Sequence, residues 1–134
     1  MARIVADVSW SKTKRDEINL ENNTQLLPAP QLAADDPVNR GFAVFQKNCL
    51  ACHRLNGAGD AQFGPDLNLP YNPTEYFQSA MLRRYLRDPQ SLRHWPQGRM
   101  PGFAETVISD AELDQLLGYL AHMASRKRSG VEVP

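Results

Sequence analysis

Cys49-Leu50-Ala51-Cys52-His53 is the stretch that decides how this chain folds, because it holds both of its cysteines and a histidine directly after them. Cys-x-x-Cys-His is the pattern of covalent c-type haem attachment. The two thiols can add to the two vinyl groups of a haem, and the neighbouring imidazole then lies beneath the iron. No cysteine is left over, which makes the motif more specific than a bare match. We predict one covalent haem c bound by Cys49 and Cys52, with His53 ligating its iron.

Two other uses of the cysteines are weaker. A structural zinc site needs about four ligands, and only the distant His94 and His122 remain to complete it. A thioredoxin-like dithiol requires a βαβ setting, which the helical pattern of this chain does not provide. Haem attachment therefore remains the favoured interpretation.

The composition indicates one globular domain without a strong charge preference. The chain has 134 residues, of which 42% are hydrophobic and 22% charged, and 15 basic residues balance 15 acidic ones. A zero net charge gives no long-range attraction toward nucleic acid. No apolar run approaches the roughly 18 residues of a membrane span. We expect neither a nucleic-acid partner nor a membrane span.

We do not expect the first residues of this sequence to act as an export signal. Residues 1–8 are too polar for the apolar core of a secretory signal, and no small-residue cleavage site follows. Haem is normally attached to thiols on the outer side of the energy-transducing membrane. We therefore expect a periplasmic protein whose first residues, Met1-Ala2, are a trimmed or re-engineered start.

Three helices and two long loops are predicted over residues 36–128. Asp36-Pro37 begins a helix that runs to about Asn48, and Thr74 begins a second that ends before Asp88-Pro89. Ser109 and Glu112 form a capping box at the start of the last helix, and the basic residues Arg126, Lys127 and Arg128 are expected to close it. Glycines and prolines make residues 55–73 and 89–103 loops. The fold class is all-α, with loops long enough to wrap a bound group.

The first 35 residues differ from this domain. Alternating apolar residues from Ile4 to Trp10 allow a brief strand, and the prolines of Leu27-Pro28-Ala29-Pro30 favour an extended linker. Residues 1–35 are therefore predicted to be an N-terminal arm, either a loose tail or a partner-docking segment. Residues 129–134 are predicted to be a C-terminal tail.

The second axial ligand of the iron decides what the haem does. Met81 and Met123 fall on apolar faces of predicted helices, where methionine usually fills the core. His94 and His122 are more simply explained as solvent-facing or satisfied histidines. Met100 lies in a loop between Gly98-Arg99 and Pro101-Gly102, where the backbone can present a thioether inward. We choose Met100.

From Asp36 to about Ser125 the chain resembles the class I cytochromes c, particularly small bacterial members. Gly41, Phe45 and Cys49 reproduce the family's four-residue steps in the first helix. Leu116 and Tyr119 resemble the pair that crosses that helix from the last one. The resemblance implies that the small glycine lets the two helices touch. It also implies a cytochrome c fold around one haem.

The resemblance extends to the surroundings of the haem. Gly64-Pro65-Asp66-Leu67 is similar to the loop whose proline packs on the proximal imidazole and whose carbonyl accepts its hydrogen bond, so Pro65 inherits that role. Trp95 resembles the indole that donates to a haem propionate. The arm has no counterpart in the minimal family fold.

These residues predict a one-electron carrier rather than an enzyme. With both axial positions filled, the iron changes oxidation state with little rearrangement. The partners would be a redox donor and acceptor, and one alternative is an electron-entry subunit or excised domain of a larger oxidoreductase docked through residues 1–35. Another alternative is a haem enzyme or small-ligand sensor with a displaceable sixth ligand. Five arginines, at 83, 84, 87, 93 and 99, form either a local basic patch or scattered solvated side chains.

Overall fold

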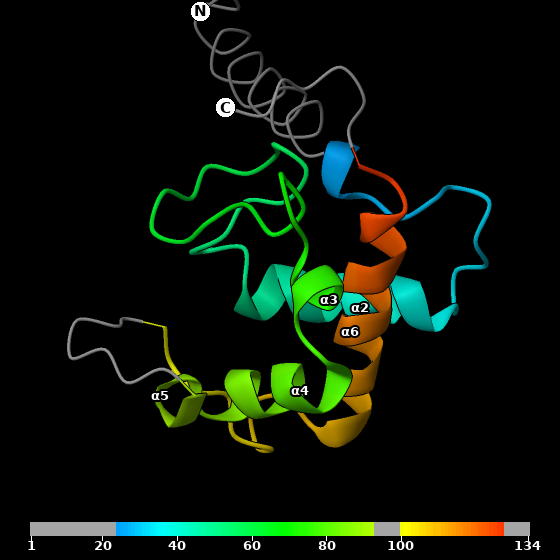
Figure 1. Cartoon of the computed structure of the whole chain (residues 1–134). Coiled ribbons are helices and arrows are strands. Elements are labelled where there is room, and N and C mark those ends of the chain that lie inside the picture. Colours follow the sequence, from blue (N-terminus) through cyan, green and yellow to red (C-terminus); the bar gives the residue numbers. More distant parts are fainter. Residues whose placement is uncertain (1–23, 93–99, 128–134) are drawn as a thin grey trace, which may run out of the picture.

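The computed structural model describes residues 24–92 and 100–127, and within these ranges the protein is helical with no strand. The elements are η1 (Thr24–Leu26), α2 (Pro37–Asn48), α3 (Pro73–Tyr76), α4 (Ser79–Arg87), α5 (Pro89–Leu92) and α6 (Asp110–Ala124). The all-α prediction is confirmed for these residues (Figure 1). None of the described helices is long and apolar enough to cross a membrane.

Local capping explains where α2 and α6 begin. The Asp36 carboxylate accepts a hydrogen bond from the Val38 backbone N–H at 2.8 Å, and Pro37 occupies the first helical position. At α6 the Ser109 hydroxyl accepts from the Glu112 N–H at 3.1 Å, and the Glu112 carboxylate accepts from the Ser109 N–H at 3.0 Å. These bonds lower the pKa of Glu112. Both predicted helix starts are confirmed.

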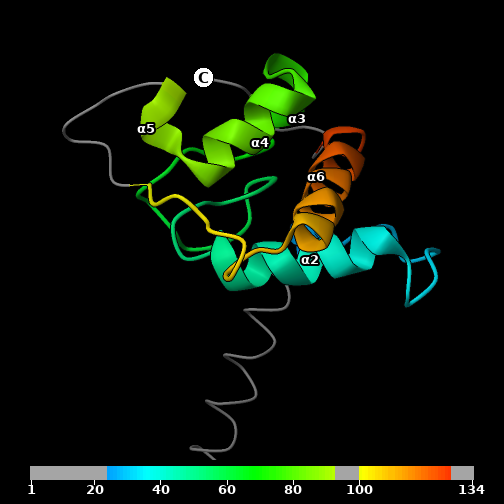
Figure 2. The same cartoon turned by 90° about the horizontal axis from the view of Figure 1, so that it is seen from below.

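The core is built where α6 crosses α2. Figure 1 shows α6 crossing α2 steeply, and Figure 2 shows the same crossing from below. The Tyr119 ring, 0% exposed, lies 5.4 Å from the ring centroids of both Phe42 and Phe45. Burial raises the pKa of the Tyr119 hydroxyl. The glycine at position 41 lies directly against α6, in agreement with the close contact that the resemblance implied.

The predicted second helix is in fact two helices. Phe77 and Gln78 adopt extended backbone conformations between α3 and α4, which a single helix over residues 74–87 would not allow. No glycine or proline marks this break. Asn72 and Glu75 form a capping box at the start of α3, and the short helix ends with its C-cap Phe77, whose N–H donates to the Pro73 carbonyl at 2.9 Å. The position predicted for Met81 was also wrong. Leu82 and Leu86 form the buried face of α4, and Met81, about 100° around the helix, is 38% exposed.

Two smaller differences concern segments after α4 and α6. Residues 89–103 were predicted to be a loop, yet Pro89 begins the short helix α5, for which its fixed backbone angle is well suited. Arg126 and Lys127 were expected to close the last helix. They lie beyond its end at Ala124 and bind other segments instead.

The end of the predicted arm packs onto the domain. Leu26 is only 1% exposed, and its carbonyl accepts a hydrogen bond from the Tyr119 hydroxyl at 2.5 Å. The Ala29 N–H donates to His122 Nε2 at 3.1 Å, and Arg126 donates to the Leu27 carbonyl at 2.6 Å. Residues 24–29 are thus bound to α6 and its extension rather than extended as a linker. The expected strand from Ile4 to Trp10 and the expected tail at residues 129–134 lie outside the described residues.

Candidate functional site

The two cysteines and the histidine leave α2 in one continuous turn. Cys49 is the C-cap of α2, and its N–H donates to the Phe45 carbonyl at 2.8 Å. The N–H groups of Cys52 and His53 both donate to the Cys49 carbonyl, at 3.1 and 2.9 Å. Both thiols are free, Cys49 buried and Cys52 exposed. Burial, followed by the proximity of Cys52, raises the pKa of the Cys49 thiol to about 12.

His53 is fixed by the loop that follows it. Its Nδ1 lies 2.8 Å from the Pro65 carbonyl oxygen, the contact that the resemblance implied. A carbonyl only accepts, so Nδ1 carries the proton and Nε2 of the neutral ring carries a lone pair. Second-sphere bonds of this kind orient metal-ligating histidines and raise their basicity. The imidazole is therefore held in the tautomer that binds a metal through Nε2.

Gly64 allows the loop to approach the imidazole. A Cβ at this position would lie 2.4 Å from Cε1 and 2.5 Å from Nδ1 of His53. The Gly64 N–H also donates to the Cys52 carbonyl at 2.8 Å. A side chain at position 64 would push the ring away from the Pro65 carbonyl.

Asp66 organises the loop directly after Pro65. One carboxylate oxygen accepts from the N–H groups of Asn68 and Leu69, both at 2.8 Å, and of Asn56 at 3.1 Å. The other oxygen accepts from Gly57 at 2.7 Å. Four backbone donors on one carboxylate fix two stretches of the loop relative to each other. They set the position of the neighbouring Pro65 carbonyl that His53 meets.

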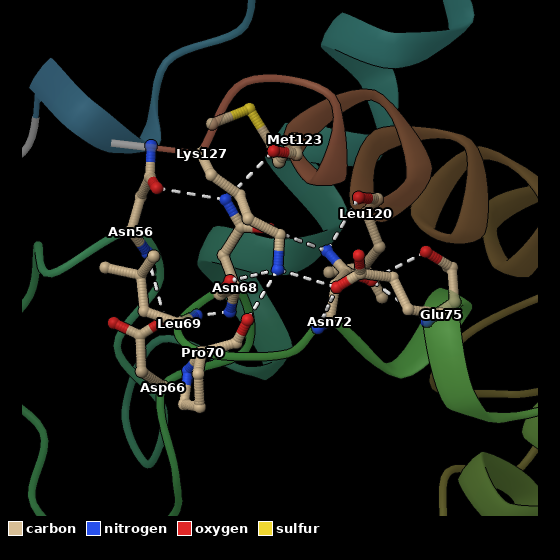
Figure 3. A network of polar contacts seen from close by, with 11 residues as sticks. Asn56, Asp66, Asn68, Leu69, Pro70, Asn72, Glu75, Leu120, Met123 and Lys127 are labelled. Atoms are coloured by element: carbon tan, nitrogen blue, oxygen red, sulfur yellow. Dashed lines mark hydrogen bonds and ion pairs between the residues drawn. The ribbon is translucent and has the colours of Figure 1, made fainter. Parts of the chain in front are cut away.

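Three buried asparagines connect this loop to α6. Asn68 Nδ2 donates to Asn56 Oδ1 at 3.0 Å and to the Met123 carbonyl at 2.9 Å (Figure 3). Asn72 Nδ2 donates to Asn68 Oδ1 at 3.1 Å and to the Leu120 carbonyl at 2.8 Å. These amides therefore bind backbone carbonyls in the C-terminal part of α6. This asparagine ladder, formed by Asn56, Asn68 and Asn72, was not predicted from the sequence.

Lys127 reinforces the same connection at the surface. Its ammonium donates to the carbonyls of Asn68 at 3.0 Å and Pro70 at 2.6 Å, and to the Glu75 carboxylate at 2.7 Å (Figure 3). The hydrogen bond from Lys127, followed by that from the Asn72 backbone, lowers the pKa of Glu75. The loop behind His53 is therefore bound to the end of α6 by both buried and exposed contacts.

The candidate axial residues have different surroundings. Met100 is partly buried and packs against the core, whereas Met123 is 1% exposed and forms part of the core. His122 accepts the Ala29 N–H, and burial, followed by the charge of Arg126, lowers its pKa. Trp95 and His94 lie outside the described residues. Met123 and His122 thus have structural partners, as predicted, and Met100 stays the predicted axial ligand.

The described arginines do not form one solvated patch. Arg83 pairs with Asp114, and Arg87 pairs with Asp110 at 2.7 Å, so both reach α6. Arg84 donates to the Ser91 hydroxyl at 3.3 Å. Arg93 and Arg99 lie outside the described residues. Internal partners of opposite charge therefore reduce the basic character that the sequence alone indicated for α4.

An open hollow of about 620 Å³ lies beside the attachment motif, lined by Leu50, Ala51 and residues 59–63. Phe63, next to the glycine that contacts His53, is 87% exposed. This exposed ring was missed by the sequence analysis, because a phenylalanine in a glycine-rich loop gives no signal of its position.

The donor set fits a covalently bound haem rather than a protein-only metal site. No cluster of three or more histidine, cysteine or acidic side chains suited to a metal occurs in residues 24–92 and 100–127. This argues against the zinc alternative within those residues. Two free thiols one turn apart and an imidazole with an available Nε2 instead match the attachment chemistry of a haem.

Comparison with known proteins agrees with this chemistry. The family model described as Cytochrome c matches residues 38–124, and the chain belongs to the cytochrome c family. No curated protein and no solved structure matched the chain. Membership of the family means that the protein is a c-type cytochrome with covalent haem c and iron, and that it transfers electrons with redox partner proteins.

Proposed function

We propose that this protein is a class I cytochrome c with a single haem, which carries one electron at a time, and that His53 and Met100 are the axial ligands. The observation that carries the proposal is the hydrogen bond from His53 Nδ1 to the Pro65 carbonyl at 2.8 Å. It supplies an oriented imidazole with its Nε2 lone pair available. When bound, the haem supplies a reversible one-electron couple at iron.

The chain's own residues account for the rest of the proposed site. Cys49 and Cys52 provide the thioether positions, and the apolar core provides the low-dielectric side of the pocket. Met100 is the candidate for the sixth position because it is partly buried in a segment without helical structure. Thioether ligation raises the reduction potential, so the protein is expected to accept electrons readily.

Replacing Met100 with alanine tests the ligation. The far-red charge-transfer band of the ferric, Met-bound form should be present in the full chain and absent from Met100→Ala. Met81→Leu is the matched control, because Met81 is an exposed methionine of α4 and its replacement should leave the band intact. A band that survives in Met100→Ala would overturn the assignment. The haem content, measured as a pyridine haemochrome, should be one per chain.

A haem enzyme or small-ligand sensor would behave differently. An open or displaceable sixth position binds carbon monoxide rapidly in the reduced protein, whereas a methionine-ligated iron does not. Slow or negligible binding of carbon monoxide to the untreated reduced protein is therefore expected. Rapid binding would favour the sensor.

The proposed location is the periplasm, and the proposed role of the residues before the domain is docking to a larger oxidoreductase. The packing of residues 24–29 changes how docking should be tested. Deleting all 35 residues would remove Leu26 from the core, so the deletion should end at residue 23. Capture of partners from the source periplasm should weaken in that variant; unchanged capture would dismiss the docking role.

A further inference from the structure

We propose that Arg87 is a positioning residue that binds the segment after Met100 to α4 and thereby retains the Met100 thioether in the axial position. This inference rests on the His53/Met100 ligation proposed above. Arg87 itself touches neither the cysteines nor His53 in the contacts described. It would act through the backbone of residues 101–108.

The guanidinium of Arg87 joins three acceptors. Its Nη1 donates to the carbonyls of Phe103 at 2.9 Å and Ile108 at 2.5 Å, and its Nη2 donates to Asp110 at 2.7 Å. The two carbonyls lie at either end of the turn over residues 103–108. A planar guanidinium with several donors suits such a task, because it can bind acceptors from different segments at once.

The backbone of α4 contacts the same segment. The Phe103 N–H donates to the Leu86 carbonyl at 2.9 Å. A Cβ on Gly102 would lie 2.3 Å from the Arg87 carbonyl oxygen, so the two backbones are in close contact there. The segment after Met100 is thus bound both by the Arg87 side chain and by the backbone at the C-terminal end of α4.

Met100 is close in sequence to this anchor. Only Pro101 and Gly102 separate it from Phe103, and three residues span at most about 10 Å. Pro101 further restricts the backbone, because its ring fixes one dihedral angle and limits the residue before it. Release of Phe103 and Ile108 would therefore give Met100 more freedom to leave an axial position.

Arg83 provides a matched control on the same helix. It lies one turn before Arg87 and pairs with Asp114, one turn after Asp110 on α6. Among the described contacts, Arg83 binds no carbonyl of residues 100–108. The two arginines therefore share their helix and type of ion pair, and differ in the contact to the Met100 segment.

The experiment is a titration of the ferric, haem-loaded full chain with imidazole, which competes with methionine for the iron, followed at the far-red band. Arg87→Gln should bind imidazole about tenfold more tightly than the unsubstituted protein, equivalent to about 1.4 kcal/mol. Arg83→Gln and Asp110→Asn should stay within about twofold, since both retain the carbonyl contacts of Arg87. Equal affinities in Arg87→Gln and Arg83→Gln would overturn the proposal, as would an equal effect of Asp110→Asn.

Arg87→Lys keeps the test decisive if the glutamine variant does not load haem. Lysine retains the charge but lacks the planar fork, so imidazole affinity should still rise by about threefold. An affinity equal to that of the unsubstituted protein would overturn the proposal. The failure of the underlying ligation has a different signature: the band would be missing from the unsubstituted protein, and both proposals would fall together.

Discussion

Gly41 of α2 and Gln115 of α6 meet backbone to backbone: a Cβ added to Gly41 would stand 1.9 Å from the Gln115 carbonyl oxygen and 2.7 Å from the Tyr119 Cβ. The crossing leaves no room for even one additional carbon. Two turns further along α2, Cys49 begins the attachment motif. The contact between Gly41 and Gln115 therefore fixes the direction from which the motif emerges.

Overpacking usually costs about 1–3 kcal/mol. Gly41→Ala should destabilise the protein by more than this, because the added carbon would meet the backbone carbonyl of Gln115, which cannot move aside as a side chain can. Gly118→Ala is the control on α6. Its Cβ would meet nothing within 4 Å, and alanine is about 0.5–1 kcal/mol better than glycine inside a helix. Urea unfolding of the haem-loaded proteins measures both changes. Comparable stability of Gly41→Ala and the unsubstituted protein would contradict the tight crossing.

Tyr119→Phe should release the segment that carries Leu26. The phenylalanine ring keeps the packing against Phe42 and Phe45 but leaves the buried Leu26 carbonyl without the Tyr119 hydroxyl, at a cost of about 1–3 kcal/mol. Amide hydrogen exchange of residues 25–29 should accelerate. Tyr71→Phe, which removes a hydroxyl from a 67% exposed residue, should change stability by less than about 0.5 kcal/mol. Unaltered exchange in Tyr119→Phe would show that the hydroxyl does not hold the segment.

Stability should depend on pH through His122, which accepts the Ala29 N–H only when Nε2 is unprotonated. Burial and Arg126 lower the pKa of His122 in the folded protein, while Asp36 opposes them. Between the depressed pKa and the unfolded value of about 6.5, the unfolded chain binds more protons. The free energy of unfolding should therefore fall as pH drops below about 6.5 and should not change on this account above it.

His122→Gln supplies the comparison, because glutamine retains an acceptor but does not titrate. The difference in unfolding free energy between the two proteins should be constant from pH 8 to 7. Below pH 7 the unsubstituted protein should lose stability relative to His122→Gln as the solution is acidified. Parallel pH profiles down to pH 5 would exclude His122 as the source of the dependence.

Asn68→Ala should be strongly destabilising, by at least about 2 kcal/mol, because it removes a fully buried amide that donates to Asn56 Oδ1 and the Met123 carbonyl and accepts from Asn72. Asn39→Ala is the control, since that amide makes an exposed bond to the Ala33 carbonyl at 2.7 Å. Its loss should cost less than about 1 kcal/mol. Thermal unfolding of the two variants distinguishes them, and similar midpoints would mean that the asparagine ladder contributes little.

The helix starts that were predicted correctly from the sequence depend on interactions between residues close together in the chain. Asp36 and Ser109 begin helices because their side chains bind backbone groups two or three residues away. The contact between His53 and Pro65 was expected from the resemblance of the Gly64-Pro65 loop to a known family, not from spacing alone. Haem attachment followed from the motif itself.

What the sequence did not predict depends on distant partners. The division between α3 and α4 carries no glycine or proline, and the apolar residues on either side continue a helical pattern. Asn56, Asn68 and Asn72 look like ordinary turn residues, and only their carbonyl partners on α6 make them a ladder. The prolines after Leu27 indicated an extended chain, whereas Tyr119 and His122 hold that chain against the helix.

The side chain of Asn56 also joins the two ends of the described chain. Its Nδ2 donates to the Gln25 carbonyl at 3.2 Å and to the Arg126 carbonyl at 3.0 Å, so the first and last portions of the described chain meet at a single side chain. Domains whose ends meet tolerate circular permutation and insertion into a host protein. The domain could accordingly be joined to a host protein through two neighbouring chain connections on one side. Most of its surface would then stay available to a protein that delivers or removes an electron.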